Sequence, residues 1–204
     1  MFAITADQVG SRSQPDLTDE GLGLILDAGG DDLVLPPDRT AGDEIQAATR
    51  DAGTALAILL RLTRDGRWSV GLGIGDVREP LPDATRAMTG TAFILARDAV
   101  EEAKKSPTRF ALAIEDGRLP DAALLQPLID LLLLLRARRS PEGWEVADML
   151  GDGRSQAQLA ETLGVTPQAV SLRVRKAQLH TERAAIAALT ELLAAAGEPP
   201  EKSS

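Results

Sequence analysis

The chain has 204 residues, which is enough for two small domains or one large one, and its 44% hydrophobic and 26% charged residues are typical of a soluble globular protein. Its net charge of −9 argues against a coat protein that binds nucleic acid without specificity. Cysteine is absent, which excludes disulfides and thiolate metal sites and is compatible with a cytoplasmic location.

Strand and helix patterns alternate in the first half of the chain. The run MFAITADQ predicts a buried strand over residues 2–7 and lacks the basic region and cleavage site of a signal peptide. Further strands are predicted at 33–35, 44–49, 68–77 and 109–115, and helices at 17–28, 51–64 and 91–105. The order β-α-β-β-α-β-α-β predicts an α+β domain over residues 1–116, with its helices on one face of the sheet, of the ferredoxin-like or nucleotidyl-cyclase-like palm kind.

Helical patterns fill the second half. Residues 117–139 predict a linker and a connecting helix that is apolar around most of its circumference, and is therefore buried against another surface. Its most apolar run, 131–135, is too short to span a bilayer, so no membrane partner is expected. Residues 140–196 predict an all-α domain that ends in a helix over 181–196, and residues 197–204 predict a disordered tail.

Residues 156–176, QAQLAETLGVTPQAVSLRVRK, predict two short helices joined by a tight turn. Ala160 leaves room for a close crossing, and Gly164 suits a left-handed residue just past the first helix. Thr166 followed by proline provides a cap and a first helical residue for the second helix. Apolar side chains that would hold the two helices together are Leu159, Leu163, Val170 and Val174. This is the helix-turn-helix pattern, whose second helix lies in the major groove of DNA.

The outward positions of the second helix carry polar and basic side chains. Five basic residues outnumber two acidic ones between residues 154 and 183, whereas the rest of the chain is acidic. The predicted DNA-binding residues are Thr166, Gln168, Ser171, Arg173, Arg175 and Lys176. We expect the amide and the serine to read base edges, the three basic residues to bind phosphate or an outer base, and the capping threonine to present its amide to a phosphate.

One such helix reads too few base pairs for useful specificity, so a homodimer on a palindromic site in double-stranded DNA is expected. Either the helix around 124–135 or the N-terminal domain would supply the two-fold contact. Two alternatives remain open, namely an ordinary helical hairpin within a core and a module that binds protein. Arg136, Arg138 and Arg139 are expected to stabilise a helix C-terminus or to contact phosphate, and His180 to lie at the surface.

Three segments of residues 1–116 carry residue types that are used in metal and phosphate chemistry. Asp7 ends the first strand, Arg39 begins the turn RTAGDE that contains Asp43 and Glu44, and residues 70–75 read VGLGIG. Two neighbouring carboxylates repel each other until a divalent cation bridges them, so these three acids are candidate metal ligands. The alternatives are structural: a loop cap, a common Gly-Asp turn, and glycines that permit close packing of a strand.

At these points the sequence resembles class III nucleotidyl cyclases and, through the turn, GGDEF cyclases. The resemblance implies that Asp7 and Asp43 bind metal ions such as Mg²⁺, that Glu44 is a third ligand, and that Arg39 contacts a nucleotide. Ile94 stands where these enzymes have asparagine, which favours a vestigial, nucleotide-sensing palm that requires no cofactor. A metal-dependent nucleotidyl cyclase or related phosphoryl-transfer enzyme is the alternative.

Nearly the whole chain resembles the SatD family of small bacterial proteins. The resemblance is carried by Asp7, by VGLGIGDV at 70–77, by MTGTAF at 88–93 with the following Ala96-Arg97, and by residues 156–177. It implies a cytoplasmic bacterial protein with a DNA-binding C-terminus. The sequence therefore predicts a dimeric, sequence-specific transcription regulator that is not an enzyme.

Overall fold

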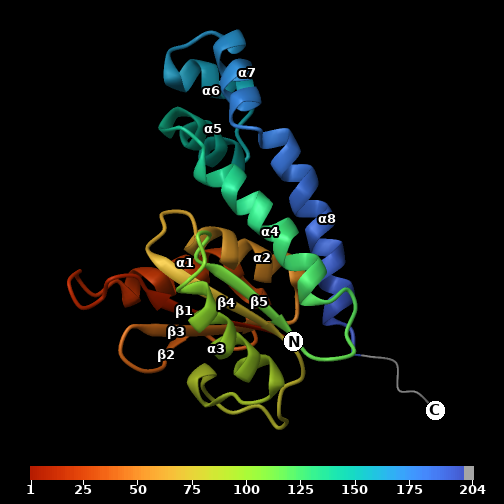
Figure 1. Ribbon diagram of the computed structural model, residues 1–204. Coiled ribbons are helices and arrows are strands. Elements are labelled where there is room, and N and C mark those ends of the chain that lie inside the picture. The colour runs from red at the N-terminus through yellow and green to blue at the C-terminus, as the bar shows by residue number, and fades with distance from the viewer. Residues whose placement is uncertain (200–204) are drawn as a thin grey trace. The chain divides into compact units, whose positions relative to one another are not determined.

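The computed structural model describes residues 1–199 and shows an α+β protein (Figure 1). The strands are Phe2–Gln8 (β1), Asp38–Arg39 (β2), Glu44–Thr49 (β3), Trp68–Ile74 (β4) and Phe110–Ile114 (β5). The α-helices are Thr18–Gly29 (α1), Ala52–Leu62 (α2), Thr91–Ala103 (α3), Ala122–Ala137 (α4), Pro141–Gly151 (α5), Gln156–Leu163 (α6), Pro167–Lys176 (α7) and Leu179–Gly197 (α8). The predicted α+β class is thus confirmed. No helix within the described residues has both the length and the apolar character needed to cross a membrane.

The five strands form one mixed sheet in the order β2-β3-β1-β4-β5. β1 is antiparallel to both of its neighbours, whereas β4 and β5 are parallel. The predicted strand at 33–35 is wrong: it forms only a single bridge, from Leu33 to Thr49 of β3, and the strand that pairs with β3 is Asp38–Arg39 instead. Pro36 and Pro37 explain the shift, because neither has an N–H to donate to a neighbouring strand.

Helices cover both faces of the sheet, so the prediction that they lie on one face is wrong. A Cβ added to Gly21 of α1 would meet Trp68 of β4, whereas one added to Gly71 or Gly73 would meet the backbone of α3. Side chains alternate along a strand, so Trp68 of β4 faces one side of the sheet and positions 71 and 73 of β4 face the other. α2 packs beside α1, and α3 lies across the other face (Figure 1). β4 is buried along its whole length, so it needs a cover on each side.

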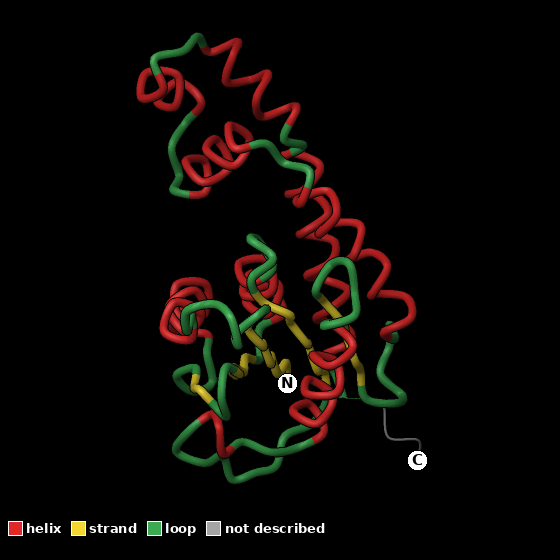
Figure 2. Tube along the Cα trace, turned by 60° about the vertical axis from the view of Figure 1, so that its left-hand side comes forward, coloured by secondary structure: helices red, strands yellow, loops and turns green. Residues whose placement is uncertain are grey.

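The contacts divide the chain into a first unit, residues 1–133 with 189 onward, and a second unit, residues 134–188. This division differs from the predicted domain limits because α4 and α8 both continue through it. Neither helix has a glycine or proline near the division that would mark a boundary in the sequence. Figure 2 shows α5, α6 and α7 of the second unit as short helices separated by brief loops.

The last turn of α8 is held within the first unit by Arg118, whose side chain is 1% exposed. Its guanidinium donates to the carbonyl oxygens of Gly197 at 3.0 Å and Glu198 at 2.8 Å, and it also binds the carboxylates of Glu115 and Asp76. The ring of Phe2 lies against Gly197, where an added Cβ would come within 2.8 Å of it. The predicted tail therefore begins with ordered residues, and its part at 200–204 lies outside the described residues.

Candidate nucleic-acid interface

The α6–α7 pair is capped at both ends of α6 and at the start of α7. The hydroxyl of Ser155 accepts from the backbone N–H of Gln158, whose side chain accepts in return from the backbone N–H of Ser155. Gly164 ends α6 with φ 62°, in the predicted left-handed conformation. The Thr166 hydroxyl then accepts from the Ala169 N–H at 3.2 Å, and proline follows as the first residue of α7. The predicted turn between α6 and α7 is thus confirmed. It could be predicted because the glycine, the capping threonine and the proline each act on the backbone within a few residues.

A small apolar core joins α5, α6 and α7. Its buried members are Val146, Leu159, Ala160, Val170 and Val174. The two valines of α7 are spaced four residues apart and so face inward together, as the sequence predicts. The contribution of α5 through Val146 was not predicted. With the inward face of α7 committed to this core, its opposite face is exposed.

The predicted DNA-binding residues separate into two groups. The side chains of Thr166, Gln168, Arg175 and Lys176 are exposed, and the last two form no ion pair within residues 1–199. Ser171 and Arg173 are partly buried and have partners inside the second unit. The Ser171 hydroxyl donates to the Gln156 side-chain oxygen at 2.9 Å, and the Arg173 guanidinium lies 2.9 Å from the Glu145 carboxylate.

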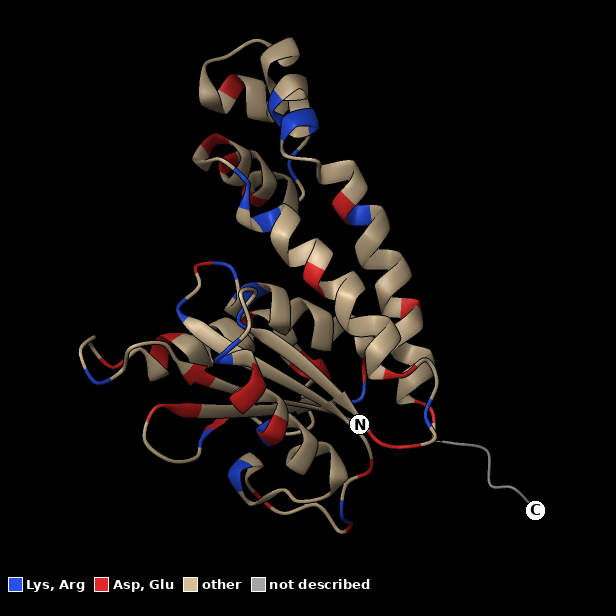
Figure 3. Ribbon diagram, in the orientation of Figure 1, with Lys and Arg blue, Asp and Glu red and all other residues tan. Residues whose placement is uncertain are grey.

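Leu172 is an outward-facing residue that the sequence interpretation missed. It is 45% exposed, four residues after Gln168 and three before Arg175, so it lies at the centre of the exposed face of α7. The buried pair Val170 and Val174 is the signal that could have located it, since residue 172 lies opposite both on a helix. Positive charge is concentrated in the last turn of α7 (Figure 3).

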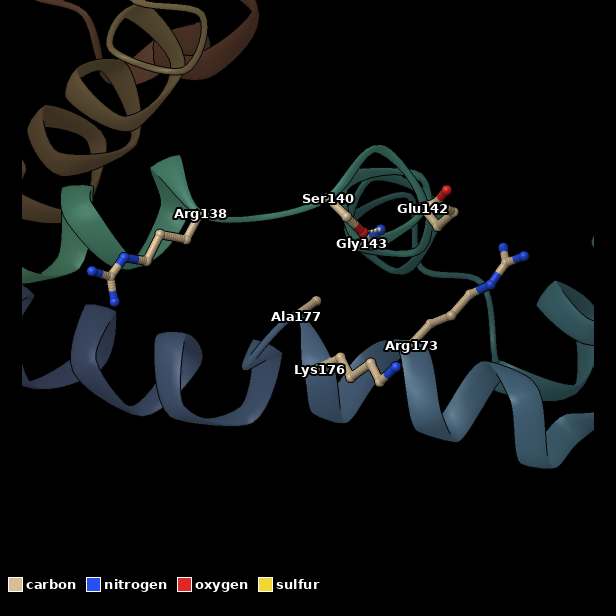
Figure 4. A pocket seen from close by; sticks show the side chains of 7 residues that line it. All are labelled: Arg138, Ser140, Glu142, Gly143, Arg173, Lys176 and Ala177. Carbon is tan, nitrogen blue, oxygen red and sulfur yellow. Dashed lines mark hydrogen bonds between the residues drawn. The ribbon is translucent and has the colours of Figure 1, made fainter.

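A cavity of about 430 Å³ lies beside this basic turn, at the start of α5. Figure 4 shows its lining, which is Arg138, Ser140, Glu142, Gly143, Arg173, Lys176 and Ala177. Three of these side chains are cationic and one is anionic. A hydrogen bond from the Ser140 hydroxyl lowers the pKa of Glu142 below its usual range, which keeps that carboxylate charged. The cavity therefore combines the cations of α7 and Arg138 with one acid from the first turn of α5.

Arg136 and Arg139 have a structural role that the sequence interpretation did not predict. Both guanidiniums bind the carboxylate of Glu182 at the start of α8, and all three side chains are largely buried. The same guanidiniums stack on the ring of Trp144, at 4.9 and 4.3 Å from its centre. Arg139 also donates to the carbonyl of Ala177, so it stabilises the C-terminus of α7 rather than that of α4. Arg138, by contrast with Arg136 and Arg139, is exposed.

Two of the three acids predicted to bind metal lie beside cations of α3 and its C-terminal end. Asp7 and Glu44 are opposite each other in the β1–β3 register. The ammonium group of Lys104 is 3.0 Å from the Asp7 carboxylate, and Arg97 is 3.6 Å from that of Glu44. Burial raises the pKa of Asp7 and Lys104 opposes that shift. This donor set does not fit a divalent metal ion, because protein cations already hold these two carboxylates.

Arg39 and Asp43 lie together at a small cavity of about 260 Å³, which is also lined by Gln8, Ser11, Arg12, Asp16 and Gly42. The Arg39 guanidinium donates to the Gly42 carbonyl at 2.5 Å and to the Asp16 carboxylate at 2.8 Å. Within residues 1–199, no three acidic or histidine side chains gather as metal ligands. The structure thus brings two of the four predicted residues to this cavity and leaves Asp7 and Glu44 against α3.

The pKa of Asp16 is about 2, chiefly because the hydroxyl and backbone N–H of Thr18 donate to its carboxylate, and then because Arg39 does so. Since this pKa is below the ordinary 3.8, the stabilising effect of the charged carboxylate is present above pH 3.8 and lost as the pH falls through about 2. Thr18→Val should move the pKa further toward 3.8 than Arg39→Ala. Carbon NMR titration of the carboxyl group measures this, and a larger shift in the arginine variant would contradict the ranking.

Comparison with known proteins adds nothing to this geometry. No family model matches the chain, and no curated protein or solved structure matches it either. Function is therefore inferred from the side chains of α7 and their surroundings.

Proposed function

We propose that the chain is a dimeric, sequence-specific DNA-binding transcription regulator in which α6 and α7 form a helix-turn-helix. The observation that carries the proposal is the exposed face of α7, on which Gln168, Leu172, Arg175 and Lys176 extend from a rigidly capped helix. In the proposed complex α7 lies in the major groove, and its first residues reach base edges. Arg175 and Lys176 form no ion pair within residues 1–199, and a phosphate backbone attracts positive charges of this kind.

The outward residues of α7 take different roles in the proposed complex, according to whether they are exposed or bound within the second unit. The Gln168 amide has the geometry to pair with adenine, and Leu172 offers an apolar contact for the methyl group of thymine. Arg175 and Lys176 bind phosphates, and Arg138 extends the same basic surface. Ser171 and Arg173 act indirectly, because they hold the start of α6 and the middle of α5 in place.

The first unit is proposed to be a ferredoxin-like, cyclase-like palm that senses a ligand. The antiparallel order β2-β3-β1-β4, with α1 and α2 on one face, supports this fold. The small cavity that contains Arg39 and Asp43 is the proposed ligand site, and its charged lining is two arginines and two aspartates. Membership of the SatD family is proposed on the sequence motifs. Cyclase activity is not proposed, because Asp7 and Glu44 are paired with Lys104 and Arg97.

The proposal predicts that the protein selects one palindrome from a random pool of duplexes, and that Arg175→Ala/Lys176→Ala abolishes the selection. Both side chains are exposed, so their removal leaves the core of the second unit intact. On the selected duplex, the slope of log affinity against log salt should become shallower by about 0.9 for each phosphate that the variant no longer neutralises. Fluorescence anisotropy at several salt concentrations measures this slope.

Arg61→Ala/Arg78→Ala is the matched control, because it removes two exposed arginines of the first unit and the same net charge. This control should select the same palindrome with an unchanged salt slope. Failure of the wild-type protein to enrich any sequence at low salt would refute DNA recognition. A partner whose binding is insensitive to salt would instead indicate a protein-binding module.

A further inference from the structure

α4 presents a second apolar face that the described residues 1–199 leave uncovered. Its inward face is formed by Leu125, Ile129, Leu132 and Leu133, all of which are buried. Its outward face carries a stripe of Leu124, Leu128, Leu131 and Leu135, and we call this stripe, with Asp121 just before the helix and Arg138 just after it, the α4 seam. Leu124, Leu128 and Leu131 are 58, 40 and 65% exposed, and Leu135 is half-buried. Single exposed leucines are ordinary, but a continuous stripe indicates a binding surface.

The spacing of the α4 seam identifies the kind of surface. Successive members are separated by three, four, three, four and three residues, which is the a/d spacing of a two-helix coiled coil. A single buried face of an α-helix does not require this second stripe. The matching partner is therefore another helix of the same spacing.

We propose that the α4 seam packs antiparallel against the α4 seam of a second copy of this chain. In this arrangement Leu128 faces Leu131 of the partner subunit, and Leu124 faces the partner's Leu135. Asp121 then faces the partner's Arg138. Two-fold symmetry repeats each contact, so the seam is complementary to itself along its whole length.

Charge selects the antiparallel direction. The seam has an exposed carboxylate at one end and an exposed guanidinium at the other. A parallel pair would place Asp121 against the partner's Asp121 and Arg138 against the partner's Arg138. The antiparallel pair brings opposite charges together at both ends, which favours it over the parallel one.

A hollow at the N-terminal end of the seam is consistent with this register. It is lined by Leu119, Pro120, Asp121, Ala123 and Leu124, and its volume is about 440 Å³. The antiparallel register places the partner's Leu135 opposite Leu124, at the edge of this hollow. The dimer deepens the proposed function by supplying its two-fold axis, yet the seam is argued from α4 alone and is tested without DNA.

Leu128→Glu/Leu131→Glu should dissociate the dimer, because it places acids opposite acids at the centre of the seam. Analytical ultracentrifugation should give the wild-type protein twice the 21.5 kDa mass of the chain, and this variant a dissociation constant raised at least about 100-fold. Leu26→Glu/Ile94→Glu is the matched control, since those residues are 49 and 64% exposed and lie outside α4. The control should remain dimeric.

Cross-linking tests the direction, and it does not depend on a charged variant that folds. The chain has no cysteine, so Leu128→Cys/Leu131→Cys should form a disulfide-linked dimer on oxidation, whereas Leu128→Cys alone should not. Cross-linking of the single variant would indicate a parallel seam and overturn the proposal. A monomeric wild-type protein at tens of micromolar (~10–50 µM, where coiled-coil dimers of useful affinity assemble) would overturn it as well, whatever the result with DNA.

Discussion

Replacing Gly73 by alanine is expected to lower the free energy of unfolding by about 3 kcal/mol. An added Cβ would lie 2.0 Å from the carbonyl oxygen of Ala92 and 2.4 Å from the backbone nitrogen of Ala96. These are backbone atoms of α3, which cannot rotate away as a flexible side chain can. The helix must therefore move off β4, and the core between them opens. Urea unfolding of the full chain measures the loss.

Gly23→Ala is the control for that prediction. Gly23 lies within α1 with no atom inside 4 Å of an added Cβ, so alanine there should leave stability unchanged or raise it by up to about 1 kcal/mol. If both variants unfold at the wild-type urea concentration, α3 does not pack as closely on β4 as described.

Replacing Glu182 by alanine is expected to destabilise the second unit by about 3–5 kcal/mol. The carboxylate neutralises both Arg136 and Arg139, whose side chains are only 13 and 1% exposed. Its removal leaves two guanidinium charges in a largely buried site. Hydrogen exchange should show faster opening of α5, α6 and α7, while β1 and β4 keep their protection. Glu191→Ala, at an exposed position of the same helix, should have little effect.

A variant with Arg136→Met, Arg139→Met and Glu182→Leu separates two effects on stability. One is the cost of leaving charges unpaired, and the other is the net contribution of the intact ion cluster. Replacing all charged members of a buried ion cluster by apolar residues is often neutral or stabilising. Within residues 1–199 the buried Nε of Arg139 has no hydrogen-bond partner, so its loss also removes an unsatisfied donor. We expect the triple variant to recover most of the stability that Glu182→Ala removes. Equal destabilisation of the single and triple variants would contradict this account.

The features predicted correctly from sequence are those that nearby residues determine. Gly164 and Thr166 end and begin helices through backbone geometry within four residues, so their types and positions predict the turn. The glycines of β4 were open to two interpretations, ligand binding and close packing. Contact of Gly71 and Gly73 with the α3 backbone establishes close packing.

The features that were missed depend on contacts between distant segments. Glu182 lies 43 residues from Arg139, and nothing in its local sequence marks it as the partner. Ser171 has the type and spacing of a base-reading residue, but its hydroxyl is already bound to Gln156 on α6. Helices cover both faces of the sheet because β4 is buried on both sides. The glycines of β4 carry no apolar side chains, so its sequence does not show that both sides are buried.

The position of α8 has a consequence for biosynthesis. The first unit includes residues 1–133 and is completed only by the segment from 189, whose last turn is held by Arg118 and lies against Phe2. A ribosome adds roughly 5–20 residues per second, so several seconds pass while residues 134–188 are made. Throughout that interval the nascent first unit lacks part of its apolar cover. It can finish folding only after translation has produced the helix that closes it.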